Sequence, residues 1–205
     1  MAEIDEVIDK NGGGPGALEV AAALNAELDL VICHKLTLAL NQEGSLGAIA
    51  DDGTLILNEA AMMKTGLSRQ QVEHEVSQVR AEIKKQSLLY KTDCPLVRVT
   101  GQTVIIVDDG LASGYTTLAA VQSVRNRRAR EIIVAVPVAP VTTMRQIEKV
   151  TDRVVTYATG VMLKFYLSDF YRHWNDISDE EVIRYLRQWR GRHSRKDSVR
   201  QSESG

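Results

Sequence analysis

The sequence has no long apolar run and only two cysteines. The longest apolar stretch, residues 132–141, has ten residues and includes two prolines, whereas a membrane-spanning helix needs about 20 apolar residues. Cys33 and Cys94 lie far apart in the chain and form no CxxC pair. This spacing argues against a disulfide framework and against a structural zinc site, so we expect two reduced thiols.

The N-terminus also lacks the basic start and apolar core of a secretion signal, which predicts a cytoplasmic protein. With 205 residues, 44% of them apolar and 25% charged, the composition is that of a packed globular domain. Residues 184–205 are strongly basic within a chain of net charge -2, and almost no apolar residue follows Trp189. We therefore predict one domain over residues 1–189 and a basic, disordered tail over residues 190–205. A solvated tail is preferred to an anion-binding one, and we expect neither a nucleic-acid nor a membrane partner.

Short apolar segments alternate with segments of helical periodicity. Strands are predicted over residues 30–33, 46–50, 54–57, 104–107, 132–136 and 154–157, and helices over residues 17–28, 67–89, 116–125 and 179–189. Apolar strands without polar alternation predict an α/β fold with a mostly parallel sheet flanked by helices. Residues 46–50 and 54–57, joined by Asp51, Asp52 and Gly53, instead predict a β-hairpin. Ser178 and Glu181 form a capping box before the last helix.

Residues 104–117 carry the strongest chemical signal. A predicted buried strand ends in Asp108 and Asp109, and a loop of small residues then leads into a helix. Ligands of parallel sheets collect at such strand ends, and a helix N-terminus favours a phosphate. Two carboxylates beside a phosphate site can accept hydrogen bonds from the two hydroxyls of a ribose. They can also stabilise positive charge that develops on the sugar ring when its anomeric bond breaks. A capped loop without any ligand is the plainer alternative.

Residues 104–117 closely resemble the phosphoribosyl pyrophosphate motif of type I phosphoribosyltransferases. The resemblance covers residues 11–182 and extends to small phosphoribosyltransferase-domain proteins of bacteria and archaea. The other segments that carry it are residues 12–15, 30–35, 41–43, 46–54, 134–140 and 170–182. It implies a type I phosphoribosyltransferase-like fold with a β-hairpin and helix insertion and a small C-terminal hood.

The resemblance also implies an activity: transfer of 5-phosphoribosyl from phosphoribosyl pyrophosphate to a nitrogen nucleophile, such as a nucleobase, with release of pyrophosphate. It implies catalytic roles for Asp108, Asp109 and Lys35. The implied substrate-binding residues are Gly110, Leu111, Ala112, Ser113, Gly114, Tyr115, Thr116, Gly13 and Gly14. Mg²⁺ is expected to be carried by the substrate pyrophosphate, with no metal site of the protein's own, and a homodimer is expected.

The sequence departs from the family pattern where positive charge is expected. Asn11 or Gly12 stands in place of the arginine of the first loop, and His34 in place of the arginine before Lys35. Each lost arginine would cost about ten- to a hundredfold in affinity. Two further hypotheses therefore stay open: a non-catalytic regulatory protein that binds phosphoribosyl pyrophosphate or a nucleotide, and an assembly scaffold. The intact acidic pair disfavours the scaffold.

Other departures and features leave alternatives open. Ile4, Val7 and Ile8 follow a helical spacing, so the family's first strand is expected to be degenerate or missing. The helix over residues 67–89 could be a lid or a packing helix. The C-terminal aromatic cluster could stack a base or simply pack; it consists of Phe165, Tyr166, Phe170, Tyr171 and Trp174. Val138, Phe165 or Tyr171 could face the acceptor. His173 and Trp174 stand where the family has an aspartate and a phenylalanine. The arginines at 125, 127, 128 and 130 are expected to complement a helix C-terminus.

Overall fold

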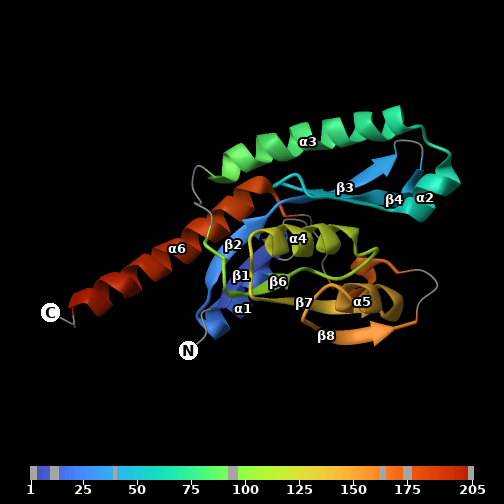
Figure 1. Ribbon diagram of the computed structural model, residues 1–205. Helices are drawn as coiled ribbons and strands as arrows, with labels where there is room; N and C mark the ends of the chain where they lie inside the picture. The colour runs from blue at the N-terminus through green and yellow to red at the C-terminus, as the bar shows by residue number, and fades with distance from the viewer. Residues whose placement is uncertain are drawn as a thin grey trace.

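A five-stranded sheet forms the centre of the computed structural model, which describes residues 4–9, 14–38, 41–91, 97–161, 165–172 and 177–202 (Figure 1). The strands run in the order β2-β1-β6-β7-β8, and every neighbouring pair is parallel. They are β1 (Ile4–Asp9), β2 (Glu27–Val31), β6 (Thr103–Val107), β7 (Glu131–Pro140) and β8 (Arg153–Gly160). The predicted parallel sheet is confirmed. The chain adds strands outward from β1 in one direction and outward from β6 in the other, and such a reversal marks the usual ligand position in open α/β sheets.

Helices cover the central strands of this sheet on both faces. Helix α1 (Gly14–Leu24) packs on β1, β2 and β6, whereas α4 (Tyr115–Asn126) and α5 (Val141–Glu148) pack on the other face. All five residues of β6 are buried for this reason. Ile106 belongs to the buried cluster that includes Ala120 of α4, and Val107 to the cluster that includes Ala17 of α1.

A second, antiparallel sheet lies beyond α4 and consists of β3 (Cys33–Leu38), β4 (Asn41–Ala50) and β5 (Leu55–Leu57). The predicted hairpin is confirmed: β4 pairs with β5, and the Ala50 N–H donates to the Thr54 carbonyl at 2.8 Å. The single strand predicted over residues 30–33 is instead the junction of two strands, because β2 ends at Val31 and β3 begins at Cys33. The apolar run contains no turn residue that would mark this change from one sheet to the other.

Helix α3 (Arg69–Lys91) covers the face of the antiparallel sheet that α4 leaves open (Figure 1). The predicted apolar face of this helix is confirmed, because its buried residues join the same cluster as Leu36 and Ile49; they are Val72, Val76, Val79 and Ile83. The short helix α2 (Glu59–Thr65) precedes it. At the end of α3 the Tyr90 hydroxyl donates to Asp179 Oδ1 at 2.5 Å, which ties α3 to the start of the last helix.

Two predictions near the N-terminus are wrong. Residues 4–9 form a strand rather than a helical segment, because β2 and β6 offer hydrogen-bonding partners on both sides. The helix predicted over residues 17–28 begins at Gly14 and ends at Leu24. Asn25 takes a left-handed conformation (φ 52°), and the Ala26 N–H donates to the Ala21 carbonyl at 3.0 Å, which together close the helix as a Schellman cap.

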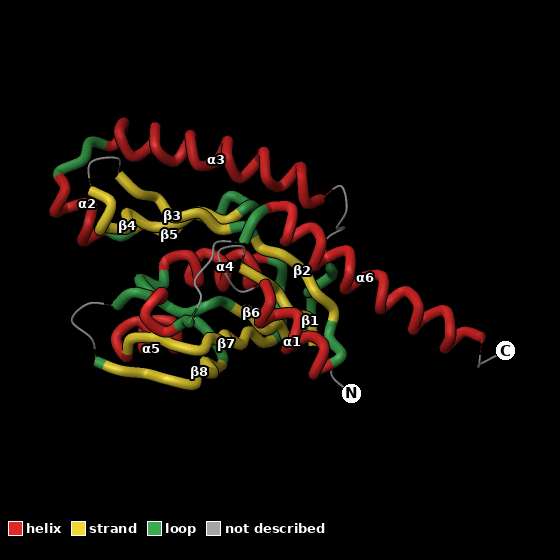
Figure 2. Tube along the Cα trace, turned by 180° about the vertical axis from the view of Figure 1, so that it is seen from behind, coloured by secondary structure: helices red, strands yellow, loops and turns green. Residues whose placement is uncertain are grey.

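The C-terminal helix α6 (Asp179–Ser202) starts where the capping box predicts. The Ser178 N–H donates to Glu181 Oε2 at 3.0 Å, and the Glu181 N–H donates to Ser178 Oγ at 3.3 Å. The helix continues well past Trp189, where we predicted that regular structure ends, and its far end extends away from the two sheets (Figure 2). Residues 190–202 contain no proline and include four arginines, and arginine sustains a helix once it has started. None of the helices in the described part of the chain is long and apolar enough to cross a membrane.

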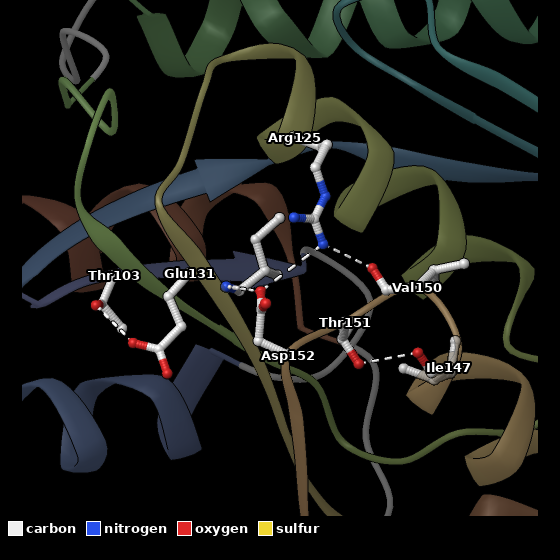
Figure 3. A network of polar contacts seen from close by, with 8 residues as sticks. Thr103, Arg125, Glu131, Ile147, Val150, Thr151 and Asp152 are labelled. Carbon is white, nitrogen blue, oxygen red and sulfur yellow. Dashed lines mark hydrogen bonds and ion pairs between the residues drawn. The ribbon is translucent and has the colours of Figure 1, made fainter.

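Arg125 in the last turn of α4 and Arg127 just after the helix brace the parallel sheet. Arg125 donates to the Val150 carbonyl at 2.8 Å and lies 3.8 Å from Asp152, whose Oδ2 accepts from the Ile132 N–H (Figure 3). Arg127 forms an ion pair of 2.6 Å with the buried Asp29 of β2. These contacts assign Arg125 and Arg127 a structural role far along the strands from the acidic pair.

Candidate functional site

Asp108 and Asp109 lie directly after β6, at the carboxyl end of the parallel sheet. Asp108 is buried: its Oδ1 accepts from the Asp109 N–H at 2.8 Å and its Oδ2 from the Thr117 hydroxyl at 3.4 Å. Asp109 is half-buried. Thr117, in the first turn of α4, therefore orients the first carboxylate, and both acids line the cavity beside the β6–α4 loop.

Burial is the main influence on the charge of this acidic pair. It raises the pKa of Asp108 above its usual value, against the opposing effects of the Asp109 N–H hydrogen bond and of Lys35. Burial and the neighbouring Asp108 raise the pKa of Asp109 to about 8, again opposed by the charge of Lys35. Burial and mutual repulsion therefore favour a protonated carboxyl in the pair, whereas a neighbouring positive charge favours the ionised form.

The β6–α4 loop surrounds a cavity of about 290 Å³, called here the polar cavity. Its described lining consists of His34, Lys35, Asp108, Asp109, Gly110, Ala112, Ser113, Gly114, Thr116, Thr117 and Leu167. Gly114, the N-cap residue of α4, has no side chain to accept from the first turn of the helix. The uncapped N–H groups and the helix dipole therefore make this end of the cavity favourable for an anion.

Two glycines of the loop are required by close contacts. Gly114 has a φ of 79°, and a Cβ there would lie 2.7 Å from Thr143 Cγ2 of α5. Thr143 of α5 also fixes the position of the loop, because its hydroxyl donates to the Ala112 carbonyl at 2.9 Å. A Cβ on Gly110 would overlap Leu167 and lie 3.0 Å from the Val138 carbonyl oxygen. The loop is thus shaped by residues that follow it by more than 25 positions.

Lys35 and His34 reach the polar cavity from β3 of the second sheet. The positive charge of Lys35 lowers the pKa of both carboxyls and so opposes the effect of burial. His34 is held by α3, with its Nε2 2.7 Å from Gln86 Oε1 and its Nδ1 3.8 Å from Glu82 Oε2. Sequence reasoning did not identify Gln86 or Glu82, because both lie far from His34 along the chain and leave no local signal.

Several other predicted site residues have different surroundings. Leu111 is fully buried, and its N–H donates to the Val138 carbonyl at 3.0 Å. The side chain of Tyr115 packs against the cluster between α4 and the sheet and does not line the polar cavity. Gly14 begins α1, while Gly13 lies outside the described residues.

A second cavity of about 440 Å³, called here the apolar cavity, lies on the α1 side of the acidic pair. Its described lining consists of Pro15, Gly16, Val20, Val107, Asp108, Asp109, Ala135, Val136, Pro137, Val155, Thr156, Tyr157 and Tyr171. Asp108 and Asp109 thus line both cavities. Sequence analysis gave no sign of this one, because its walls come from α1, β7, β8 and the segment after β8.

The C-terminal aromatic segment, residues 165–172, lies over the acidic turn and contains the short 3-10 helix η1 (Leu167–Phe170). The Tyr171 hydroxyl donates to the Asp109 carbonyl at 2.6 Å. Phe165 packs against Phe170, with ring centroids 5.2 Å apart, and Val138 is buried. Of the three residues expected at the acceptor, Tyr171 therefore lines a cavity; His173 and Trp174 lie outside the described residues.

Comparison with known proteins finds three informative similarities. Residues 57–163, just over half of the chain, match the family model described as "Phosphoribosyl transferase domain". Over 175 residues the chain is 32% identical to "Putative phosphoribosyl transferase Rv0571c" of Mycobacterium tuberculosis, a match that covers 85% of this chain and 39% of that protein. The chain thus spans about two fifths of the length of that relative. The crystal structure of TT1426 from Thermus thermophilus superposes with a TM-score of 0.72 at 30% identity, covering 92% of this chain and 88% of the other.

Proposed function

Because the chain belongs to the phosphoribosyl transferase domain family, we propose that it transfers 5-phosphoribosyl from phosphoribosyl pyrophosphate to a nitrogen nucleophile, with release of pyrophosphate. The observation that carries the proposal is an acidic pair, with Asp108 buried and Asp109 half-buried, that shares one cavity with an uncapped helix N-terminus and Lys35. A nucleobase acceptor, a place in nucleotide metabolism, a cytoplasmic location and a homodimer are the finer parts of the same proposal. All the residues proposed to act lie within 1–189.

In the proposed reaction Asp108 and Asp109 hold the ribose through its vicinal hydroxyls. The bond from C1 to the pyrophosphate oxygen breaks, and its electron pair leaves with pyrophosphate. The ring then carries positive charge, which favours the ionised form of the acidic pair and is stabilised by it. The positive charge of Lys35 opposes the raised pKa of the pair, and a bound Mg²⁺ would add to this effect, so both favour the ionised carboxylates that would stabilise the sugar.

The phosphate of the same substrate would bind at the start of α4. The backbone of Ala112, Ser113 and Gly114 and the hydroxyl of Thr116 line the polar cavity at this end. A phosphate there gains from the unsatisfied N–H groups and the positive end of the helix. Gly110, Gly114 and Thr143 keep the loop open around it.

Lys35 is proposed to meet the leaving pyrophosphate together with Mg²⁺. No group of three His, Cys, Asp or Glu side chains within the described ranges could hold a metal ion by itself. The donors present, the Asp108 and Asp109 carboxylates, suit an Mg²⁺ that keeps most of its ligands from substrate phosphates and water. When bound, Mg²⁺ would neutralise charge on the leaving group.

A non-catalytic binding protein is the second candidate function. The observation in its favour is the scarcity of positive charge: Lys35 and His34 are the basic residues among the described lining of the polar cavity, and His34 is engaged by Gln86. Such a protein would recognise ribose and its 5-phosphate, and the pyrophosphate group would add little to the binding affinity.

Calorimetric titration separates the two candidates. Phosphoribosyl pyrophosphate with Mg²⁺ is compared with ribose 5-phosphate, on the wild type and on Asp109→Asn. The transferase predicts that the first ligand binds at least tenfold more tightly and that Asp109→Asn weakens it. Equal affinities would support the binding protein and end the transferase proposal, and no binding of either ligand would leave the fold as a scaffold. Light scattering on the same samples tests the homodimer.

A further inference from the structure

The two edges of the parallel sheet differ in length and charge. Strand β2, at one edge, has five residues and carries Glu27 and Asp29, of which Asp29 pairs with Arg127. Strand β8, at the other edge, has eight residues, no proline, and Arg153 as its one charged residue. No strand in the described part of the chain pairs with the outer side of β8, which is the outermost strand in both views (Figures 1 and 2). Charges, prolines and short length usually protect a sheet edge from further pairing, so β8 is the edge that is open to another strand.

One face of β8 is also left uncovered by helices. Helix α1 packs on β1, β2 and β6, whereas α5 packs on the opposite face of the sheet, where Val154 joins the cluster of α5. Because side chains alternate along a strand, Val155 and Tyr157 lie on the α1 face, beyond the reach of that helix. Tyr157 and Val161 are 96% and 93% exposed, more than any other large apolar residue in the described ranges. Exposed apolar side chains beside an open strand edge mark an interaction surface.

The residues along β8 are compatible with a second copy of the same strand. A two-fold axis through the strand pairs it antiparallel with its copy, and residues directly opposite each other share a face. With the axis at Thr156, Val155 lies opposite Tyr157 of the second copy, and this favourable pair of a β-branched and an aromatic side chain occurs twice. Arg153 lies opposite Thr159, so the two copies of the one charge of the strand are about 20 Å apart. No like charges face each other in this pairing.

We propose that two copies of the chain associate through β8, with the two-fold axis at Thr156, so that their parallel sheets join into one continuous sheet. The inference rests on that part of the proposed function which expects a homodimer, and it assigns the interface. A stable interface buries about 800 Å² on each partner, and Tyr157 supplies about 150–250 Å² of it. The contact uses the same surface on both copies, so it closes on itself and forms a dimer rather than a filament.

Thr159 provides the test, because it is exposed, lies opposite Arg153 of the second copy and lines neither cavity. Thr159→Lys places like charges opposite each other twice in the dimer, whereas Thr159→Glu places opposite charges there. Lysine and glutamate are both unfavourable in strands, so the comparison between the two variants isolates the charge. We expect the dissociation constant of the dimer, measured by analytical ultracentrifugation of the full chain, to be at least tenfold higher for Thr159→Lys than for Thr159→Glu.

Two controls accompany this measurement. Thr37→Lys and Thr37→Glu change an exposed threonine of β3, an edge strand of the antiparallel sheet, and their dimers should dissociate equally. Backbone amide exchange of the wild type adds a readout that needs no variant. Exchange in β8 should slow as the protein concentration is raised through the dissociation constant, whereas exchange in β2 should not change.

Calorimetric titration of the same variants with phosphoribosyl pyrophosphate separates a failure of the interface from a failure of the proposed reaction. A wild type that stays monomeric at about 100 μM, equal dissociation constants for Thr159→Lys and Thr159→Glu, or unchanged exchange in β8 would overturn the β8 interface. Binding of phosphoribosyl pyrophosphate by these proteins would then leave the transferase proposal standing. If phosphoribosyl pyrophosphate does not bind while the variants at Thr159 differ as expected, the interface stands and the transferase proposal fails.

Discussion

The polar cavity and the apolar cavity share two residues and differ in how the chain builds them. Most of the polar cavity comes from one continuous stretch, Asp108 to Thr117, with Lys35 and His34 added from β3. The apolar cavity takes its walls from α1, β7, β8 and Tyr171, which are spread over more than 150 positions. A continuous loop at a helix N-terminus can be recognised in a sequence, whereas an apolar cavity made from distant elements cannot.

The largest effect is expected for Asp109→Asn, which changes one of the two residues that line both cavities. The substitution keeps the shape of the side chain and removes the carboxylate that would face the developing charge, so we expect the transferase kcat/KM to fall by about 100- to 1,000-fold. Pyrophosphate release with a nucleobase acceptor is the measurement. Asp169→Asn is the control, since Asp169 is exposed on η1 and lines neither cavity. Equal losses in the two variants would contradict the assignment of Asp109.

Lys35→Ala tests whether positive charge is confined to the polar cavity. Loss of one charged hydrogen bond should weaken phosphoribosyl pyrophosphate by about ten- to a hundredfold in calorimetry. Ribose 5-phosphate affinity should change much less, because Lys35 is proposed to meet the pyrophosphate. Lys64→Ala, at an exposed lysine of α2, serves as the control. An equal effect on both ligands would contradict the proposed contact between Lys35 and the pyrophosphate.

The protonation of the acidic pair makes stability depend on pH. Because the folded pKa of Asp109 is raised to about 8, this group favours folding at low pH, and the benefit is lost as the pH rises from about 4 to about 8. Between pH 5 and pH 8.5 the free energy of unfolding of the wild type should therefore fall by up to about 4 kcal/mol relative to that of Asp109→Asn. Urea denaturation at the two pH values measures the difference. Parallel curves for the two proteins would show that the carboxyl titrates normally.

Gly114→Ala probes the shape of the polar cavity. The new Cβ would meet Thr143 Cγ2, and we expect a loss of about 1.5 kcal/mol of stability together with weaker ribose 5-phosphate binding. Gly101→Ala is a close control, because Gly101 has nearly the same φ (77° against 79°) and open space around its Cβ position. Adding Thr143→Ser to Gly114→Ala removes the clashing methyl, keeps the hydroxyl and should restore part of the loss. If the two glycine variants lose stability equally, the contact with Thr143 is irrelevant.

Tyr171→Phe carries the smallest expected effect. It removes the hydrogen bond to the Asp109 carbonyl while leaving the ring in the wall of the apolar cavity, at a cost of about 1 kcal/mol. The KM for the acceptor should rise by about fivefold with kcat and phosphoribosyl pyrophosphate affinity nearly unchanged. Tyr166→Phe, in the same segment and exposed, is the control. A fall in phosphoribosyl pyrophosphate affinity instead would place Tyr171 with the polar cavity.

The sequence predicted those parts of the fold whose determinants are local. The apolar run before Asp108, the hairpin around Gly53, the buried face of α3 and the capping box at Ser178 each depend on residues within a few positions of one another, and all of them are confirmed. The sequence also contains a local signal for the end of α1, because asparagine, here Asn25, is a residue type that adopts the left-handed conformation at helix ends. It was missed because the apolar pattern continues past it without a break.

By itself, then, the sequence determined the parallel sheet, the acidic pair at the end of β6 and the small-residue loop before α4, since periodicity and residue type within one short stretch specify each of them. Only the tertiary structure decided that residues 4–9 form a strand, that α3 holds His34, and that Tyr171 rests on Asp109 beside a second cavity. Each of these depends on groups brought together from distant positions. Burial, hydrogen-bond partners and the pKa values of the carboxyls arise only when the packed chain excludes water from them.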